Sequence, residues 1–215
     1  MGIRAMKLYS FPGAPSPMRV ELMLKYKGIT LDTEVVNIRG GAQFDVAYRT
    51  VNPRCTVPAL VLDDGSCLTE VIAICLFLDG RFPQPPVFGT NAVERAHVVN
   101  WMHRIFNEGF VPAAEILRNS SEAMKDRALP GPDDIPQIAQ LVERGRRRLP
   151  ILFDELERHL ADRRFLVGDT LSQADIDAWV VVYFARWVKV APPESLRQLV
   201  DWRQRIAELV GQAST

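Results

Sequence analysis

The chain has 215 residues, of which 47% are hydrophobic and 24% charged, a composition typical of a globular protein with one large or two smaller domains. Lys and Arg number 26 together, as do Asp and Glu, so no bulk charge favours nucleic acid or an acidic membrane surface. No apolar run reaches the ~18 residues of a transmembrane helix, and the N-terminus lacks the apolar core of a signal peptide. We therefore expect a cytoplasmic protein that binds neither nucleic acid nor membranes.

Strands and helices alternate in the first third of the chain. Residues 7–10 predict a short strand, and Ser16 is expected to cap a helix that ends at Gly28. Residues 31–38 then predict a second strand, and residues 44–50 a short helical or irregular piece.

A hairpin follows. Pro58 can open a strand, and the apolar run 59–62 comes directly after it. Asp64-Gly65 is a strong signal for a tight reversal into residues 66–68. With a helix that runs on to Phe82, the order is β-α-β-α-β-β-α, which is that of a thioredoxin-like domain.

Two neighbouring features of this hairpin point to a ligand. Val57 precedes a proline and is held extended, so its N–H and C=O remain open to an extended peptide. Thr69 is expected to cap the following helix, with Glu70 in its first turn and a free N–H on Val71. Amides there can bind a carboxylate and Glu70 an ammonium group, as in a peptide with a free amino-acid end.

The rest of the chain predicts helices. Prolines and a glycine in residues 83–91 indicate a linker. A long helix is expected over residues 92–118 with a kink at Pro112, and another over residues 134–160.

The last third carries a clear helix start. Ser172 and Asp175 form a capping box, and the helix after it, to about Val188, is apolar nearly all round. We expect this helix at the centre of the second domain. Residues 194–209 predict a final amphipathic helix.

Two motifs resemble one family. Asn-Pro-x-x-x-Val-Pro-Ala-Leu from Asn52, followed by Asp-Gly, Leu-Thr-Glu and Ala-Ile, is similar to the glutathione-binding half of a glutathione S-transferase. Gly-Asp-x-Leu-Ser-x-Ala-Asp-Ile-Asp after Phe-Leu-Val is similar to the helical domain of the same family. The resemblance implies an α/β thioredoxin-like domain over residues 6–82, the linker 83–91 and an all-helical domain over residues 92–210.

The resemblance also implies roles for several residues. A cis peptide bond follows Val57, whose backbone pairs with the cysteinyl unit of glutathione. Glu70 meets the γ-glutamyl end, and only the backbone N–H of Val71 helps there, because this position commonly holds a serine. Arg39 and Gln43 are candidates to hold the glycyl carboxylate, with solvated loop side chains as the alternative.

The group that activates the thiol is less obvious. Ala14 stands where several members of the family carry a hydroxyl, and the pattern is most similar to a fungal and bacterial branch that lacks it. Ser16 is the nearest replacement, although as a helix cap its hydroxyl has a competing partner. Arg118 stands where that branch has a histidine, and is a second candidate to stabilise the thiolate.

The family implies conjugation of glutathione thiolate to a small hydrophobic electrophile, a role in detoxification and a homodimer. No metal site is expected. Trp101, Arg104 and Phe110 are candidates for an electrophile pocket, with core packing as the alternative. Two other functions remain open: a glutathione-binding protein without turnover, and a disulfide or peroxide reductase that uses bound glutathione or Cys55, expected to be partly exposed.

Overall fold

The computed structural model describes residues 6–212 and divides into two compact units. Of the described residues, the first unit combines 6–84 with Leu129–Asp134, and the second contains Pro85–Ala128 and 135–212. The first holds a mixed sheet with helices and the second is helical, which confirms the predicted fold class.

The sheet of the first unit has four strands in the order β2-β1-β3-β4. They are β1 (Lys7–Ser10), β2 (Asp32–Val35), β3 (Ala59–Val61) and β4 (Cys67–Leu68). β1 runs parallel to β2 and antiparallel to β3, which in turn is antiparallel to β4. All four residues of the edge strand β2 are exposed, and the strand is shorter than the predicted range 31–38.

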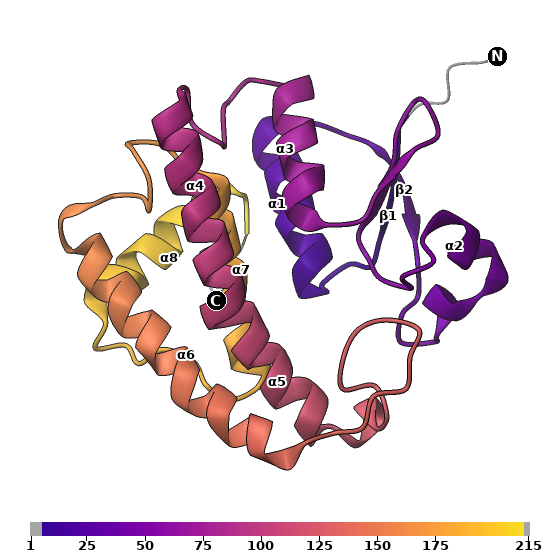
Figure 1. Cartoon of the computed structure of the whole chain (residues 1–215). Coiled ribbons are helices and arrows are strands. Elements are labelled where there is room, and N and C mark those ends of the chain that lie inside the picture. The colour runs from indigo at the N-terminus through magenta and orange to yellow at the C-terminus, as the bar shows by residue number, and fades with distance from the viewer. Residues whose placement is uncertain (1–5, 213–215) are drawn as a thin grey trace. The chain divides into compact units, whose positions relative to one another are not determined.

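Helices cover the two faces of this sheet unequally. α1 (Pro15–Lys27) and α3 (Val71–Arg81) pack together on one face, whereas the short α2 (Val46–Val51) lies on the other (Figure 1). A single 3-10 turn, Ala42–Phe44, leads into α2. The face toward α2 is therefore the less completely covered one.

The start of α1 differs from the prediction. Ala14 is the N-cap and Pro15 the first helical residue, so Ser16 lies inside the first turn and caps nothing. The amide of Met18 donates the first helical hydrogen bond to the Ala14 carbonyl, at 2.9 Å. Pro15 is already fixed near helical φ, so the helix begins there, and the Met18 amide that a Ser16 cap would serve is bonded to the Ala14 carbonyl instead.

α3 also begins one residue later than expected. Glu70 is its N-cap, with φ −105° and ψ 135°, and Thr69 lies before it. The extended conformation of β4 continues through Glu70, so helical geometry starts only at Val71.

The second unit opens with a nearly continuous helical run. α4 (Ala92–Ile105) passes through a π-helical turn, Phe106–Phe110, into α5 (Val111–Ser120). Pro112 is the second residue of α5, so the irregularity predicted at this proline is the wider turn directly before it.

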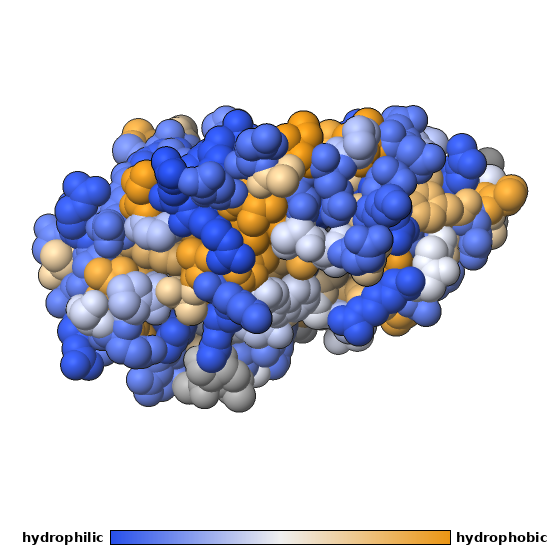
Figure 2. Space-filling model, turned by 90° about the horizontal axis from the view of Figure 1, so that it is seen from below, coloured by the Kyte–Doolittle hydropathy of each residue, from blue (hydrophilic) through white to orange (hydrophobic). Residues whose placement is uncertain are grey.

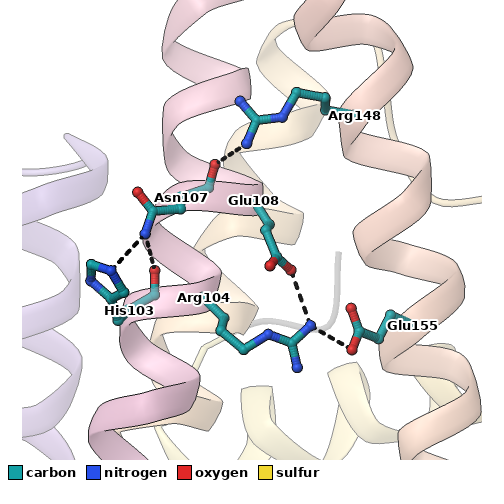
Figure 3. A network of polar contacts seen from close by, with 6 residues as sticks. All are labelled: His103, Arg104, Asn107, Glu108, Arg148 and Glu155. Carbon is teal, nitrogen blue, oxygen red and sulfur yellow. Dashed lines mark hydrogen bonds and ion pairs between the residues drawn. The ribbon is translucent and has the colours of Figure 1, made fainter.

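Side chains from α6 (Ala139–His159) meet this π-helical turn (Figure 3). Arg148 donates a 2.6 Å hydrogen bond to the backbone carbonyl of Asn107. Arg104 lies between two carboxylates, 3.2 Å from Glu108 and 2.5 Å from Glu155. A π turn disturbs the regular helical ladder, and Arg148 supplies a donor to a carbonyl within it.

α6 begins at Ala139 rather than at residue 134. Ile135 instead pairs with the loop before it, because its N–H donates to the Asp126 carbonyl and its C=O accepts from Ala128, at 2.8 and 3.0 Å. Ile138, inside the predicted helix, is instead the N-cap of α6 and is 51% exposed.

The centre of the second unit is α7 (Gln173–Trp187), where nearly every side chain is buried. Its start is the predicted capping box of Ser172 and Asp175, which is confirmed. α8 (Arg197–Leu209) closes the unit.

The surface drawn in Figure 2 is mainly hydrophilic, with hydrophobic side chains in the gaps. Large exposed apolar residues such as Val46 (80%) and Val93 (67%) are of the kind that any soluble domain carries singly. No helix within residues 6–212 is both long and apolar enough to cross a membrane.

Candidate functional site

The sheet topology brings the predicted ligand-binding segments of the first unit to one edge. β1 is followed by α1, and β2, parallel to it, is followed by the loop that carries Arg39 and Gln43. β3 is antiparallel to β1, so its first residue, Ala59, lies beside Tyr9 near the carboxyl end of β1. β4 is antiparallel to β3, so Leu68, its last residue, pairs with Leu60 at the same end. The segments before β3 and after β4 therefore meet the start of α1.

The backbone at Val57 is open, as predicted. The Val57-Pro58 peptide bond is cis, which confirms the implication of the resemblance. Within residues 6–212 the N–H and C=O of Val57 make no hydrogen bond, whereas the strand pairing of β3 begins two residues later at Ala59. An extended ligand can pair with this edge.

Two side chains that the sequence analysis missed hold the residue before this edge. The Tyr48 hydroxyl and the Asn52 amide nitrogen both donate to the carbonyl oxygen of Thr56, at 2.5 and 2.8 Å. Asn52 is fully buried, and burial raises the pKa of Tyr48 to about 12, so its phenol remains a donor at any physiological pH. The Asn-Pro pair at residues 52–53 was the available signal, since asparagine commonly bonds to nearby backbone.

Cys55 is not partly exposed, contrary to expectation. Its side chain is 4% exposed, and its sulfur lies 3.7 Å from the Pro53 carbonyl oxygen. Its backbone has φ +55°, in the left-handed region that glycine adopts without strain. The burial argues against direct redox chemistry at Cys55.

Glu70 lies at the N-terminus of α3, and its carboxylate is exposed to solvent. Its only ion pair with a described residue is to Arg54, at 3.8 Å, and both side chains are about two-thirds exposed, at 66% and 69%. Such a pair contributes little to stability, so a ligand ammonium can replace Arg54 at modest cost. The amide of Val71, the first helical residue, makes no hydrogen bond with another residue in the described range.

Arg39 and Gln43 follow β2 and differ in their surroundings. The Arg39 guanidinium is exposed and lies over the Phe11 ring, 5.8 Å from its centroid, beside the end of β1. Gln43 is buried, and its Oε1 has no hydrogen-bond partner in the part of the chain that the structure describes. A buried amide oxygen without a partner is costly, which is consistent with a ligand group completing it.

The start of α1 offers few groups to a thiol. Pro15 and Pro17 have no N–H, so Ser16 supplies both the free amide and the only hydroxyl of this turn. The Ser16 hydroxyl forms no hydrogen bond within residues 6–212, and Ala14 contributes only a methyl group. The competition with capping is therefore absent.

Arg118 belongs to the second unit, near the end of α5. Its Nη1 donates to the Arg127 carbonyl oxygen at 2.9 Å, and burial lowers the pKa of its guanidinium. Gln137 in turn bonds to the Arg118 carbonyl at 2.7 Å, so this arginine takes part in holding the loop between α5 and α6.

Comparisons with known proteins agree with this arrangement. The family model of the glutathione S-transferase N-terminal domain matches residues 14–81, and that of the C-terminal domain matches residues 139–209. Glutathione S-transferase 2 of Saccharomyces cerevisiae is 27% identical over 209 residues, which are 94% of this chain and 86% of the yeast protein. Glutathione S-transferase GstA of Escherichia coli is 28% identical over 212 residues, which are 94% and 93% of the two chains.

A solved structure extends the likeness to the whole fold. The crystal structure of a glutathione S-transferase domain-containing protein from Marinobacter aquaeolei superposes with a TM-score of 0.85 at 30% identity, covering 94% of this chain and 97% of that one. The two family models and this structural match agree with the motifs at Val57 and Ser172 in pointing to one family. The chain belongs to the glutathione S-transferase family.

Proposed function

We propose that the chain acts as a glutathione transferase on small hydrophobic electrophiles. The glutathione thiol loses its proton to solvent, the thiolate attacks an electrophilic carbon, and the leaving group departs as a thioether forms. The observation that carries the proposal is that the N–H and C=O of Val57, before the cis-proline, are unpaired among residues 6–212. The exposed Glu70 carboxylate, at the N-terminus of α3, adds a partner for the ammonium group.

The first unit offers a partner for each polar part of glutathione. The N–H and C=O of Val57 pair with the cysteinyl backbone as an added strand would. The N–H of Val71 at the start of α3 donates to the γ-glutamyl carboxylate, and the Glu70 carboxylate accepts from the ammonium group beside it. At the glycyl end, Arg39 supplies a guanidinium for the carboxylate, and Gln43, whose buried Oε1 has no hydrogen-bond partner among residues 6–212, lies in the same loop.

Ser16 is the group that we propose to stabilise the thiolate. A helix N-terminus contributes only ~0.3–1 kcal/mol at an exposed site, less than one pKa unit at ~1.36 kcal/mol per unit. A hydrogen bond to a charged sulfur is worth ~1.5–3 kcal/mol, so the donor matters more than the dipole. The hydroxyl and amide of Ser16 are unpaired among residues 6–212, and both can donate. Arg118 stays the second candidate for this role.

The decisive experiment measures binding and turnover separately. Wild type should be retained on immobilised glutathione and should conjugate glutathione to a chlorodinitrobenzene. Ser16→Ala should keep the affinity for glutathione but raise the pKa of the bound thiol by about one to two, because it loses the hydroxyl donor. Ser195→Ala, an exposed serine of the second unit, is the matched control and should behave as wild type. An unchanged thiol pKa in Ser16→Ala would exclude the hydroxyl, and Arg118→Met would then be the variant to measure.

A second candidate function rests on Ala14. This residue caps α1 without a hydroxyl, so the chain also has the features of a protein that binds glutathione or another ligand without turnover. Retention on glutathione with no conjugation of any aryl or alkyl electrophile would favour this function.

The assembly and location follow the family resemblance. We propose that two copies form a homodimer, and that the protein works in the cytoplasm in detoxification. Light scattering coupled to gel filtration should give twice the chain mass of 24.2 kDa. A mass equal to one chain at micromolar concentration would refute the dimer.

A further inference from the structure

The sheet of the first unit has a cleft on the face that α2 covers. This cleft lies apart from the residues around Val57 and Glu70, where glutathione is proposed to bind (the glutathione edge). Its volume is about 250 Å³, and it lies within the first unit between the edge of β2 and α2. The cleft arises because α2 has only six residues and so leaves part of this face uncovered. A water molecule occupies about 30 Å³ of liquid and drug-sized pockets start near ~300 Å³, so the cleft suits a small organic molecule.

The walls of the cleft are apolar and aromatic. Aliphatic surface comes from Val35 at the end of β2, from Val36 directly after it and from Ala47 on α2. Tyr9 and Tyr48 contribute rings whose centroids are 5.8 Å apart and whose planes are inclined by 58°. The Tyr48 ring is fixed, because its hydroxyl donates to the Thr56 carbonyl. This wall is therefore formed before any ligand arrives.

Two acidic residues, Glu34 and Asp45, line the same cleft. Glu34 is already paired: Lys7 lies 2.7 Å from its carboxylate and 5.5 Å from the centroid of the Tyr9 ring. A tyrosine ring and a carboxylate thus hold a primary ammonium group at this position.

Tyr48 and Asp45 offer the same two chemical groups a second time. Asp45 precedes α2, yet its side chain does not cap the helix, and no hydrogen bond or ion pair joins its carboxylate to another residue in the described range. Arg49, one turn further along α2, does not pair with it either. A carboxylate, an aromatic wall and an aliphatic floor together favour a ligand with a positive charge on a small apolar body.

We propose that this cleft is a binding site for a small organic ammonium ion, such as an aralkyl amine, separate from the glutathione edge. The apolar body of the ligand packs between Val35, Ala47 and the Tyr48 ring, and its ammonium group lies beside Asp45. The assignment does not depend on the transferase activity, because its groups are on the α2 face of the sheet.

The test uses the full chain, without glutathione, and two probes of equal shape. Benzylamine, which is protonated at pH 7, and neutral benzyl alcohol are titrated while backbone amide NMR signals are followed. The signals of Val35, Asp45 and Ala47 should shift and saturate with benzylamine, and benzyl alcohol should bind about tenfold more weakly, as expected for a cation–π contact plus one exposed ion pair.

Two pairs of variants test which residue binds the charge of the ligand and whether the cleft holds its apolar body. Asp45→Asn should reduce benzylamine affinity about threefold without changing that of benzyl alcohol, because the ion pair is lost and the cation–π contact remains. Asp32→Asn, on the same exposed strand as Val35 but outside the cleft, should change neither affinity. Ala47→Phe should fill the cleft and abolish binding of both probes, and Val46→Phe, its exposed neighbour on α2, should leave binding intact. The amide spectrum reports whether each variant is folded. If Ala47→Phe does not fold, Asp45→Asn alone tests the proposal.

Three outcomes overturn the proposal: equal affinity for the two probes, equal effects of Asp45→Asn and Asp32→Asn, or displacement of benzylamine by glutathione. The last would place the amine on the glutathione edge. Amine binding is measured without glutathione, so it does not depend on the transferase activity. A chain that binds the amine but is inactive as a transferase can therefore be told apart from an active chain that does not bind the amine.

Discussion

The Tyr48 hydroxyl donates a 2.5 Å hydrogen bond to the carbonyl oxygen of Thr56, the residue that directly precedes Val57. The same oxygen accepts from Asn52, so two side chains on its amino-terminal side fix the strand on which glutathione is proposed to pair. The shape of this edge thus depends on residues that do not touch the proposed ligand.

Tyr48→Phe should therefore destabilise the protein and weaken glutathione binding. The loss removes one of two donors to a shared oxygen, so we expect a cost of about 1 kcal/mol in the free energy of unfolding. Urea unfolding measures this cost, and calorimetry should show a rise in the Kd for glutathione. An increase in Kd without any change in stability would contradict this account, because both effects arise from the same bond.

Alkaline unfolding tests the same residue. The pKa of Tyr48 is raised from 10.0 to about 12 in the folded protein, mainly by burial. Below pH 10 the phenol is protonated in both states. Between pH 10 and 12 the unfolded chain gives up this proton while the folded chain keeps it, so stability falls as pH rises. Wild type should lose roughly 2–3 kcal/mol more than Tyr48→Phe across this window. Parallel stability curves for the two proteins would show that Tyr48 titrates normally.

Glu70→Ala should weaken glutathione binding by ~2 kcal/mol or more, because it removes the charged partner of the ligand ammonium. Stability should change little, since Glu70 is 66% exposed and its ion pair with Arg54 is long. Calorimetric titration with glutathione measures the affinity. Asp64→Ala, an exposed carboxylate at the nearby hairpin turn, is the control for net charge and should bind normally. Unchanged affinity in Glu70→Ala would place the γ-glutamyl end elsewhere.

A buried ion pair joins the two helices on the opposite face of the sheet from α2. Lys27 at the end of α1 lies 2.8 Å from Asp79 on α3, with side-chain exposures of 0% and 10%, and also donates to the Phe82 carbonyl at 2.8 Å. Asp79→Ala strips the carboxylate from a buried ammonium group, so we expect a loss of about 3–5 kcal/mol in unfolding free energy.

The double variant Lys27→Met with Asp79→Leu separates charge from packing. Replacing a buried pair with apolar residues is often close to neutral, so this variant should recover most of the stability that Asp79→Ala loses. Glu34→Ala, which breaks the exposed pair with Lys7, should cost less than about 1 kcal/mol. If Asp79→Ala costs no more than Glu34→Ala, the buried pair does not hold α1 to α3. Chemical denaturation of all three variants gives the comparison.

The sequence allowed the fold to be predicted where one local signal decided the outcome. Asp64-Gly65 fixed the hairpin, Gly28 the end of α1, and Ser172 with Asp175 the start of α7. Prediction failed where two signals competed. Ser16 was predicted to be a helix N-cap, but α1 already begins at Pro15. Thr69 was predicted to be the N-cap of α3, but the backbone is still extended at Glu70, which is the N-cap instead.

The candidate site shows the same division. The candidate residues at the cis-proline edge could be named because one short motif contains them, and their roles toward glutathione stay predictions. Gln43 is buried, which excludes the solvated-loop alternative for this side chain. Tyr48 and Arg54 were missed, since their roles depend on a hydrogen bond to Thr56 and on an ion pair to Glu70, neither of which leaves a pattern in the sequence. The exposure of Cys55 was mistaken because loop residues are usually exposed, whereas the loop here folds back over this thiol.

Asp175 is the polar centre of the second unit. Its carboxylate is fully buried and accepts four hydrogen bonds: from the Leu166 amide (2.9 Å), the Trp202 indole (3.0 Å), and the Ser172 amide and hydroxyl (3.0 and 2.6 Å). These bonds connect the loop before α7, the start of α7 and α8. Asp175→Asn keeps the shape but replaces one acceptor oxygen with a donor, which must then face a donor group.

We therefore expect Asp175→Asn to cost about 1–3 kcal/mol in unfolding free energy, because at least one buried donor loses its acceptor. Trp202→Phe removes only the indole donor and should cost less. Asp169→Asn, an exposed carboxylate in the same loop, should lie within about 0.5 kcal/mol of wild type. Urea unfolding monitored by circular dichroism gives all three values. A cost for Asp175→Asn as small as that for Asp169→Asn would mean that packing alone, and not this carboxylate, holds α7 and α8 together.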